Sequence, residues 1–160
     1  MKIYLAGSCS SDKRTMMQHI ARHLRKLGHE VYCPFELKIE NAWDYSQEVW
    51  AQMVFNADIK ALDAANLIVM ITPGRVSTAG TNWEQGYAYA RCKPILVFQH
   101  TREAASLMTY CGCSNFYAMD FTDCDDIDSF PEGLAARIAL LVKHCLSTDT
   151  TKLPTSLVLT

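Results

Sequence analysis

The sequence has neither an excess of positive charge nor a long apolar run. Its 160 residues carry 15 basic and 17 acidic side chains, which gives a formal net charge of -2. A protein without a basic field lacks the means to hold a nucleic-acid backbone. No stretch approaches the roughly 18 apolar residues of a membrane span, and the start "MKIYLAG" lacks the pattern of a signal peptide. We therefore expect a cytoplasmic protein whose partner is neither a membrane nor a nucleic acid polymer.

The seven cysteines lack the spacing of a metal site or a disulfide framework. Their number is odd, no C-x-x-C occurs, and "CGC" at 111–113 has no second pair to match it. We expect reduced thiols, as in other cytosolic proteins, and no metal. Neither a Walker A loop nor a G-x-G-x-x-G fingerprint is present, and we predict no cofactor.

Strand-like and helix-like segments alternate along the chain. The hydrophobic pattern predicts strands at 2–7, 29–34, 67–72, 94–99 and near 115–119. It predicts helices at 12–28, 44–66, after 73–81, near 102–109 and near 132–146. Strands that are apolar on both faces indicate a parallel sheet covered on both sides. We expect one α/β domain over 1–147, doubly wound, with a mainly parallel five-stranded sheet of the flavodoxin or Rossmann kind. Residues 148–160 would form a C-terminal tail.

Three loops follow the predicted strands at the edge where such sheets bind ligands, namely 7–12, 73–81 and 99–103. The first two are rich in small and hydroxyl residues and lead into helix N-termini. Free N–H groups and the positive end of the helix dipole make such places receptive to anions. Serine and glycine also occur in any ordinary turn, so both interpretations stay open at this point.

Glu84, in "GTNWEQGYAYA", has two interpretations. Thr81 and Glu84 have the spacing of a capping box, in which Glu84 accepts from the N–H of Thr81. A carboxylate in the first turn of a helix would also have a lowered pKa, and an ionised carboxylate at the sheet edge is a competent nucleophile. Spacing alone favours the cap.

The aromatic residues of the long helical segment have a structural explanation. We expect Trp50 and Phe55 to pack in the core. Trp43 would either pack there as well or form a wall of a pocket.

Five segments in a fixed order carry a resemblance to a known family. They are "KIYLAGS", "EVYCPFE", "EVWAQMVFNADIKALDAANLIV", "AGTNWEQGYAYARCKPILVF" and "SLMTY". Over about residues 2–120 the chain resembles the nucleoside 2-deoxyribosyltransferase family. The resemblance implies an enzyme that cleaves the N-glycosidic bond of a 2'-deoxynucleoside, or of its 5'-monophosphate, and transfers the sugar to an acceptor base.

The resemblance also implies roles for individual residues. Glu84 would attack the anomeric carbon and form a glycosyl-enzyme ester, Asp58 would be the acid and base, and the hydroxyl of Tyr4 would hold the nucleophile. If its helix began at Asp44, however, Asp58 would lie about 21 Å along that helix, far from the sheet edge unless the helix projects or bends. The residues expected to bind substrate are Gly7, Ser8, Thr78, Gly80, Ser106 and Met108.

Three positions depart from the transferase pattern towards hydroxyl groups. Thr78 replaces the usual Asp six residues before the nucleophile, Ser8 replaces a Pro or small residue, and Ser106 replaces an Asn. Related nucleoside-monophosphate N-glycosidases carry hydroxyls at these places, and hydroxyls accommodate a 5'-phosphate that a carboxylate would repel. A nucleotide N-glycosidase with water as acceptor is therefore the alternative. A non-catalytic nucleotide sensor is a third candidate, which the combination of Glu84, Asp58 and Tyr4 argues against.

The segment "SLMTY", residues 106–110, bears on assembly. In the family that it resembles, a neighbouring subunit lends this segment, including the counterparts of Ser106 and Met108, to the active site. We therefore expect a homo-oligomer with shared sites, acting on small nucleosides or nucleotides and on purine or pyrimidine bases.

Overall fold

The computed structural model describes residues 1–10, 13–74, 78–119 and 130–147, so the predicted tail lies outside the described residues. The strands are β1 (Lys2–Ala6), β2 (Glu30–Tyr32), β3 (Leu67–Thr72), β4 (Ile95–Gln99) and β5 (Asn115–Ala118). The helices are α1 (Arg14–Lys26), α2 (Gln47–Ala64), α3 (Ala79–Ala90), α4 (Leu107–Cys111) and α5 (Phe130–Ser147). Two short 3₁₀ turns, Pro34–Glu36 and Ala42–Asp44, lie between β2 and α2. None of the helices described is long and apolar enough to cross a membrane.

The five strands form one sheet in the order β2-β1-β3-β4-β5, and every neighbouring pair is parallel. After β1 the chain adds β2 on one side and then returns past β1 to add β3 on the other. The order therefore reverses between β1 and β3, as in flavodoxin-like proteins. The predicted single-domain, doubly wound α/β fold is confirmed.

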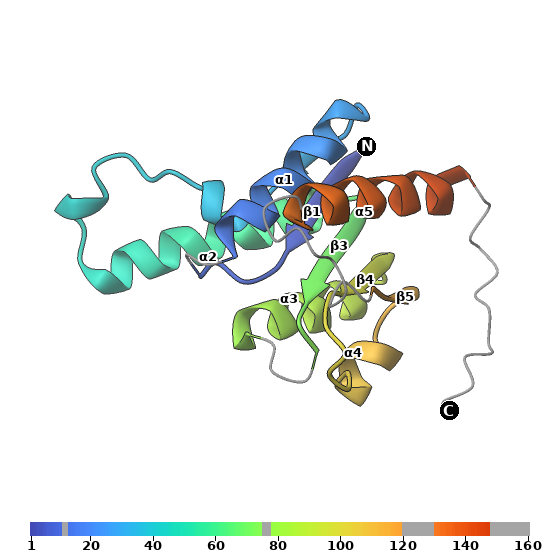
Figure 1. Ribbon diagram of the computed structural model, residues 1–160. Helices are drawn as coiled ribbons and strands as arrows, with labels where there is room; N and C mark the ends of the chain where they lie inside the picture. Colours follow the sequence, from blue (N-terminus) through green and yellow to red (C-terminus); the bar gives the residue numbers. More distant parts are fainter. Residues whose placement is uncertain (11–12, 75–77, 120–129, 148–160) are drawn as a thin grey trace.

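The helices cover both faces of the sheet (Figure 1). Helices α1 and α5 lie on one face, over inward-pointing residues such as Leu5, Val69 and Phe98. Helices α2 and α3 lie on the other, over Tyr4 and Met70. Alternate residues of each strand thus enter different cores, which explains why the strands read as continuous apolar runs.

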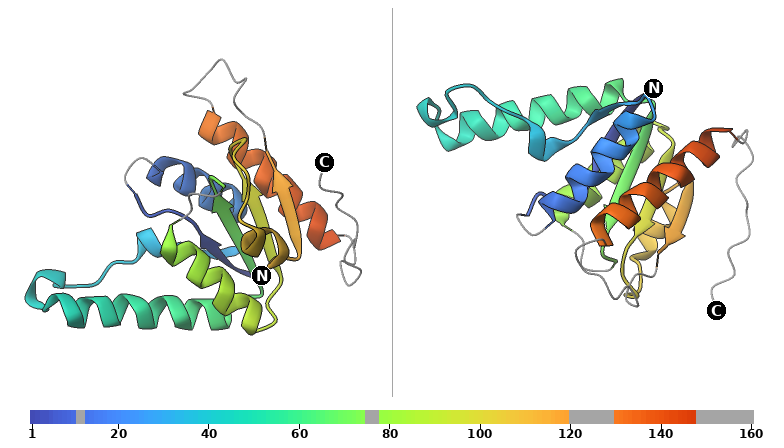
Figure 2. Two further views of the ribbon diagram at one scale, coloured as in Figure 1. Left: turned by 90° about the horizontal axis from the view of Figure 1, so that it is seen from below. Right: turned by 45° about the horizontal axis from the view of Figure 1, so that its top comes forward.

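Helix α2 extends well past the sheet, and Figure 2 shows its N-terminal half standing clear of the other elements. Its C-terminal end is held at the amino edge, where the N–H of Asn66 donates to the carbonyl of Lys2 at 2.8 Å. The prediction of Trp50 and Phe55 as core residues is wrong, because neither belongs to a buried cluster. The Phe55 ring packs against Trp83 of α3, with centroids 5.4 Å apart, and stays partly exposed. Trp50 is 39% exposed and Phe55 48%, while Trp43 is 98% exposed and neither packs in a core nor walls a pocket within the chain.

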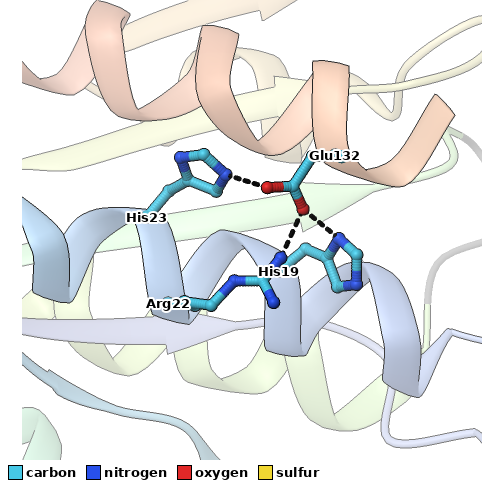
Figure 3. A network of polar contacts seen from close by, with 4 residues as sticks. All are labelled: His19, Arg22, His23 and Glu132. Carbon is cyan, nitrogen blue, oxygen red and sulfur yellow. Dashed lines mark hydrogen bonds and ion pairs between the residues drawn. The ribbon is translucent and has the colours of Figure 1, made fainter. Parts of the chain in front are cut away.

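A single carboxylate joins α5 to α1 (Figure 3). Glu132 accepts from Arg22 and lies in ion-pair contact with His19. Its other oxygen is 2.7 Å from Nε2 of His23. The hydrogen bond with His23 and the charge of Arg22 lower the pKa of Glu132 to about 2. Glu132 therefore stabilises the packing of α5 in its ionised form.

We expect Glu132→Gln to lower the thermal unfolding midpoint at pH 7. Because folding depresses the pKa of Glu132, its contribution is present above the unfolded pKa of about 4.3 and is lost as pH falls through about 2. The difference between wild type and variant should therefore shrink over that interval in scanning calorimetry. Glu30→Gln is the control, since Glu30 meets Lys2 only at 4.0 Å on an exposed surface. Equal midpoints for wild type and Glu132→Gln at pH 7 would contradict the prediction.

Candidate active site

Two tyrosines from neighbouring strands form the floor of the candidate site. Tyr4 of β1 and Tyr32 of β2 are register partners. Parallel partners point to the same face of a sheet, so their rings stack, with centroids 5.4 Å apart and planes 24° apart. Tyr4 is fully buried, and a buried tyrosine hydroxyl needs a polar partner.

That partner is Glu84 of α3. The Tyr4 hydroxyl donates to Oε1 of Glu84 at 2.6 Å. The capping-box prediction is wrong, because the helix begins at Ala79 with Thr78 as its N-cap, so Thr81 already lies inside the first turn. Glu84 is consequently in the second turn, where its side chain reaches back over β1.

The pKa of Glu84 is raised to about 7, which corrects the expected lowering. Burial is the largest cause, the hydrogen bond from Tyr4 acts in the opposite direction, and the charge of Asp58 adds a further rise. The helix dipole is weak here because its effect falls off within the first turn. Glu84 is thus a half-buried carboxyl that titrates near neutral pH.

Asp58 lies in the same network, and the projection of α2 removes the difficulty of its position. Helix α2 begins at Gln47 and extends past the sheet (Figure 2), and Asp58 in its C-terminal half meets Tyr32 of β2. The hydroxyl of Tyr32 donates to Oδ1 of Asp58 at 2.8 Å. Burial raises the pKa of Asp58, and the bond from Tyr32 partly counters that rise.

Tyr32 is the member of this network that sequence reasoning missed. It connects Asp58 to the stacked ring of Tyr4 and so to Glu84. Burial and the neighbouring carboxyls raise the pKa of both tyrosines, which therefore remain hydrogen-bond donors. The signal was available in principle, because aligning the first two predicted strands in parallel places the two tyrosines side by side.

The hydroxyl-rich loops after β1 and β3 meet at a cavity of about 150 Å³. Ser8 and Thr78, both expected to bind substrate, line this cavity. The Thr78 hydroxyl lies 2.5 Å from that of Thr81. Gly80 is exposed in the first turn of α3, with open space where a side chain would be. Gly7 is buried over Met17, whose thioether methyl would lie 2.5 Å from an added Cβ.

Ser106 and Met108 lie elsewhere in this chain. They line a separate hollow of about 320 Å³ between α3 and α4. The side-chain amide of Gln85 fixes that segment by donating to the carbonyls of Thr109 at 2.8 Å and Gly112 at 3.0 Å. Met108 is 83% exposed. Within one chain, therefore, these two residues are not brought together with Glu84.

The described part of the chain holds no group of three or more His, Cys, Asp and Glu residues that could bind a metal ion. None of its six cysteines forms a disulfide. What the site offers is a carboxyl pair, Glu84 and Asp58, each held by a tyrosine hydroxyl. Two carboxyls in different surroundings can divide the roles of nucleophile and proton donor.

Comparisons with known proteins identify the family. The sequence profile of the family described as nucleoside 2-deoxyribosyltransferase matches residues 3–147. The chain belongs to the nucleoside 2-deoxyribosyltransferase family, as its sequence segments predict. It is accordingly an enzyme of N-glycosidic bonds, either a glycosyltransferase or an N-glycosidase. No curated protein matches the sequence significantly.

Solved structures show the same fold. A 2-deoxyribosyltransferase from Bacillus psychrosaccharolyticus is 29% identical, with a TM-score of 0.62 over 80% of this chain and 93% of that one. A conserved protein from Enterococcus faecalis V583 is 19% identical, with a TM-score of 0.65 over 88% and 98%. The Clostridium botulinum CMP N-glycosidase BcmB is 15% identical, with a TM-score of 0.55 over 84% and 98%. At their lower identities the last two indicate the fold alone.

We expect Tyr32→Phe to raise the pKa of Asp58, because the variant loses the hydroxyl that stabilises the ionised carboxylate. The carboxyl carbon of Asp58, followed by NMR against pH, should titrate at a higher midpoint than in wild type. Tyr87→Phe is the matched control, since the Tyr87 hydroxyl donates to Asp63 at 3.0 Å on the exposed surface. An unchanged Asp58 midpoint in Tyr32→Phe would show that the hydroxyl does not tune this carboxyl.

Proposed function

We propose that the protein is a nucleoside 2-deoxyribosyltransferase that works by double displacement, with Glu84 as nucleophile and Asp58 as acid and base. The observation that carries the proposal is the continuous contact from Glu84 through Tyr4 and Tyr32 to Asp58. A structural carboxylate needs no second carboxyl arranged in this way. The similarity to a 2-deoxyribosyltransferase at 29% identity supports the same reaction class.

In the first step, an oxygen of ionised Glu84 attacks the anomeric carbon of the sugar while the bond to the base nitrogen breaks. The bond from Tyr4 engages Oε1, so we assign the attack to Oε2. Asp58 delivers its proton to the departing base, which would otherwise leave as a poor anion. The products are the neutral base and a deoxyribosyl ester of Glu84.

In the second step, a nitrogen of an acceptor base attacks the same carbon and Glu84 leaves as a carboxylate. Asp58 takes the proton that the acceptor loses, which restores both carboxyls to their starting states. Two displacements retain the configuration at the sugar carbon, as in retaining glycosidases. The pKa of Glu84 is raised to about 7, chiefly by burial, and burial also raises the pKa of Asp58, which favours a protonated donor.

Hydrolysis is the second candidate function. The cavity lined by Ser8 and Thr78 favours it, because hydroxyl groups near a helix N-terminus suit the 5'-phosphate that nucleotide N-glycosidases bind. Incubation of a deoxynucleoside, or its 5'-monophosphate, with and without a second base separates the candidates. A swapped base identifies a transferase. Free base formed without an acceptor in many equivalents per enzyme identifies a hydrolase, since ester formation alone frees only one equivalent. If neither product forms, the protein is a nucleotide-binding module without this activity.

We expect Glu84→Ala to reduce base release by at least about a thousandfold, since the variant lacks the attacking oxygen. The fold should persist, because leaving the Tyr4 hydroxyl without its partner costs only about 1–3 kcal/mol. Base release is followed by chromatography, and folding by circular dichroism.

Glu40→Ala is the control for this experiment, since Glu40 is an exposed carboxyl on the segment between β2 and α2. Wild type mixed with a deoxynucleoside but no acceptor should also gain the mass of one deoxyribosyl group, mapped to Glu84 by peptide analysis. Near-normal turnover of Glu84→Ala would remove Glu84 from the mechanism.

Assembly into a homo-oligomer is part of the proposal. Leu107 and Met108 are 70% and 83% exposed, and Val49 and Trp50 of α2 are 47% and 39% exposed. Both features suit contact with a second copy, in which the segment 106–110 of one subunit would complete the site of another.

Sedimentation velocity at assay concentration should therefore give a species of at least twice the chain mass of 18.0 kDa. Met108→Asp should shift the protein towards monomer and lower turnover in parallel, because a charge replaces an apolar contact. Leu146→Asp, at another exposed apolar position, controls for the added charge. A fully active wild-type monomer would exclude shared sites.

A further inference from the structure

An aromatic contact joins the two helices that carry the carboxyl pair. Asp58 lies on α2 and Glu84 lies on α3. The rings of Phe55 on α2 and Trp83 on α3 have centroids 5.4 Å apart, which is within the range in which aromatic rings attract each other. Phe55 precedes Asp58 by about one helical turn. Trp83 is the neighbour of Glu84 in the sequence. The ring contact therefore joins the two helices close to both carboxyls.

The C-terminal end of α2 is tied to α3, and to the residues just after it, by several bonds at once. Both Nε and Nη2 of Arg91 lie 3.1 Å from Oδ1 of Asp63. The Tyr87 hydroxyl donates to the same oxygen at 3.0 Å. Nζ of Lys93 donates to the backbone carbonyls of Asp63 at 2.6 Å and Ala65 at 2.8 Å. Because these bonds are redundant, the loss of one of them leaves this end of α2 in place.

The carboxyl pair lies between these two ties on both helices. Leu62 is the buried residue of α2, so packing against the sheet holds only a short part of that helix. Without the ring contact, α2 could turn about its anchored end and carry Asp58 away from Glu84. The rings of Phe55 and Trp83 are each 48% exposed. Half-exposed rings contribute less to the stability of a fold than buried ones, so stability alone does not explain the contact.

We propose that Phe55 and Trp83 are positioning residues, whose ring contact fixes the separation of the two carboxyls and thereby sets the rate of the reaction. The inference rests on the proposed function, because it concerns the residues assigned as nucleophile and proton donor. A misplacement of about 1 Å can lower a rate on the order of a hundredfold. Loss of the contact should therefore lower kcat and leave KM nearly unchanged, because the groups that bind substrate stay in place.

The titration of Glu84 reports the separation of the carboxyls without any turnover. Burial, and to a smaller extent the charge of Asp58, raise the pKa of Glu84 to about 7. Both effects weaken when α2 moves away from α3, because water enters and the second charge is farther off. The hydrogen bond from Tyr4 comes from β1 and does not involve α2. Tyr32 and Cys9, which also interact with Glu84, have raised pKa values and are neutral at pH 7. Loss of the ring contact should therefore lower the pKa of Glu84.

The test measures turnover of a deoxynucleoside and, by NMR, the titration midpoint of the Glu84 carboxyl carbon. Phe55→Ala and Trp83→Ala should each lower kcat at least about tenfold, keep KM within about twofold and lower the Glu84 midpoint. The double variant should lose little more than either single variant, because both residues act through one contact. Trp83→Phe keeps a ring and should retain most of the activity. Leu140→Ala controls for the truncation of an exposed apolar side chain, since Leu140 is 63% exposed on α5.

Circular dichroism and sedimentation check that each variant keeps its fold and assembly, and Phe55→Leu replaces Phe55→Ala if the latter does not fold. A lower kcat together with a lower Glu84 midpoint supports the positioning role. If the wild type is active, an unchanged kcat, an unchanged midpoint or additive losses in the double variant overturn that role and leave the proposed function intact. A wild type that releases no base overturns the proposed function, and the Glu84 midpoint then decides by itself whether the ring contact holds the carboxyls.

Discussion

The hydrogen bond from the Tyr4 hydroxyl to Glu84 is the contact on which the site depends. It joins the buried centre of the sheet to the helix that carries the reactive carboxyl. Burial alone would favour the neutral acid, which cannot attack carbon, and a fully solvated carboxylate would be held less firmly. The tyrosine places Glu84 between these limits, with a pKa of about 7. Stacking of Tyr32 on Tyr4 then ties the second carboxyl to the same floor.

The fold was predictable because its determinants are local and repeated. Each buried strand is a short, mostly apolar run, such as "LIVMIT" in β3. All six residues of that run are buried, and the first five alternate between the two cores. The helix boundaries were harder to predict from the sequence. The segment 44–66 was predicted as helix from its start, whereas Asp44 belongs to a 3₁₀ turn and α2 begins at Gln47. Family resemblance supplied the candidate residues, and packing decided how they meet.

What sequence reasoning could not supply was the environment of each side chain. The pKa of Glu84 was expected to fall because the helix start was placed three residues too late and desolvation was left out. Trp50 and Phe55 were assigned to the core from their apolar character, although whether a helix has a second layer above it depends on how far it extends past the sheet. Tyr32 escaped notice because its role arises from pairing across strands.

The projection of α2 has a mechanical consequence. A helix that is anchored at one end moves more, when it bends, the farther a residue lies from that anchored end. Leu62 is the buried residue of α2, and it marks the anchored end of the helix. Asp58 lies four residues away, about 6 Å along the axis, whereas Trp50 is about 18 Å away. Asp58, the proposed proton donor, therefore lies near the anchored end of the helix, so bending of the helix around Trp50 leaves the spacing of the carboxyl pair nearly unchanged.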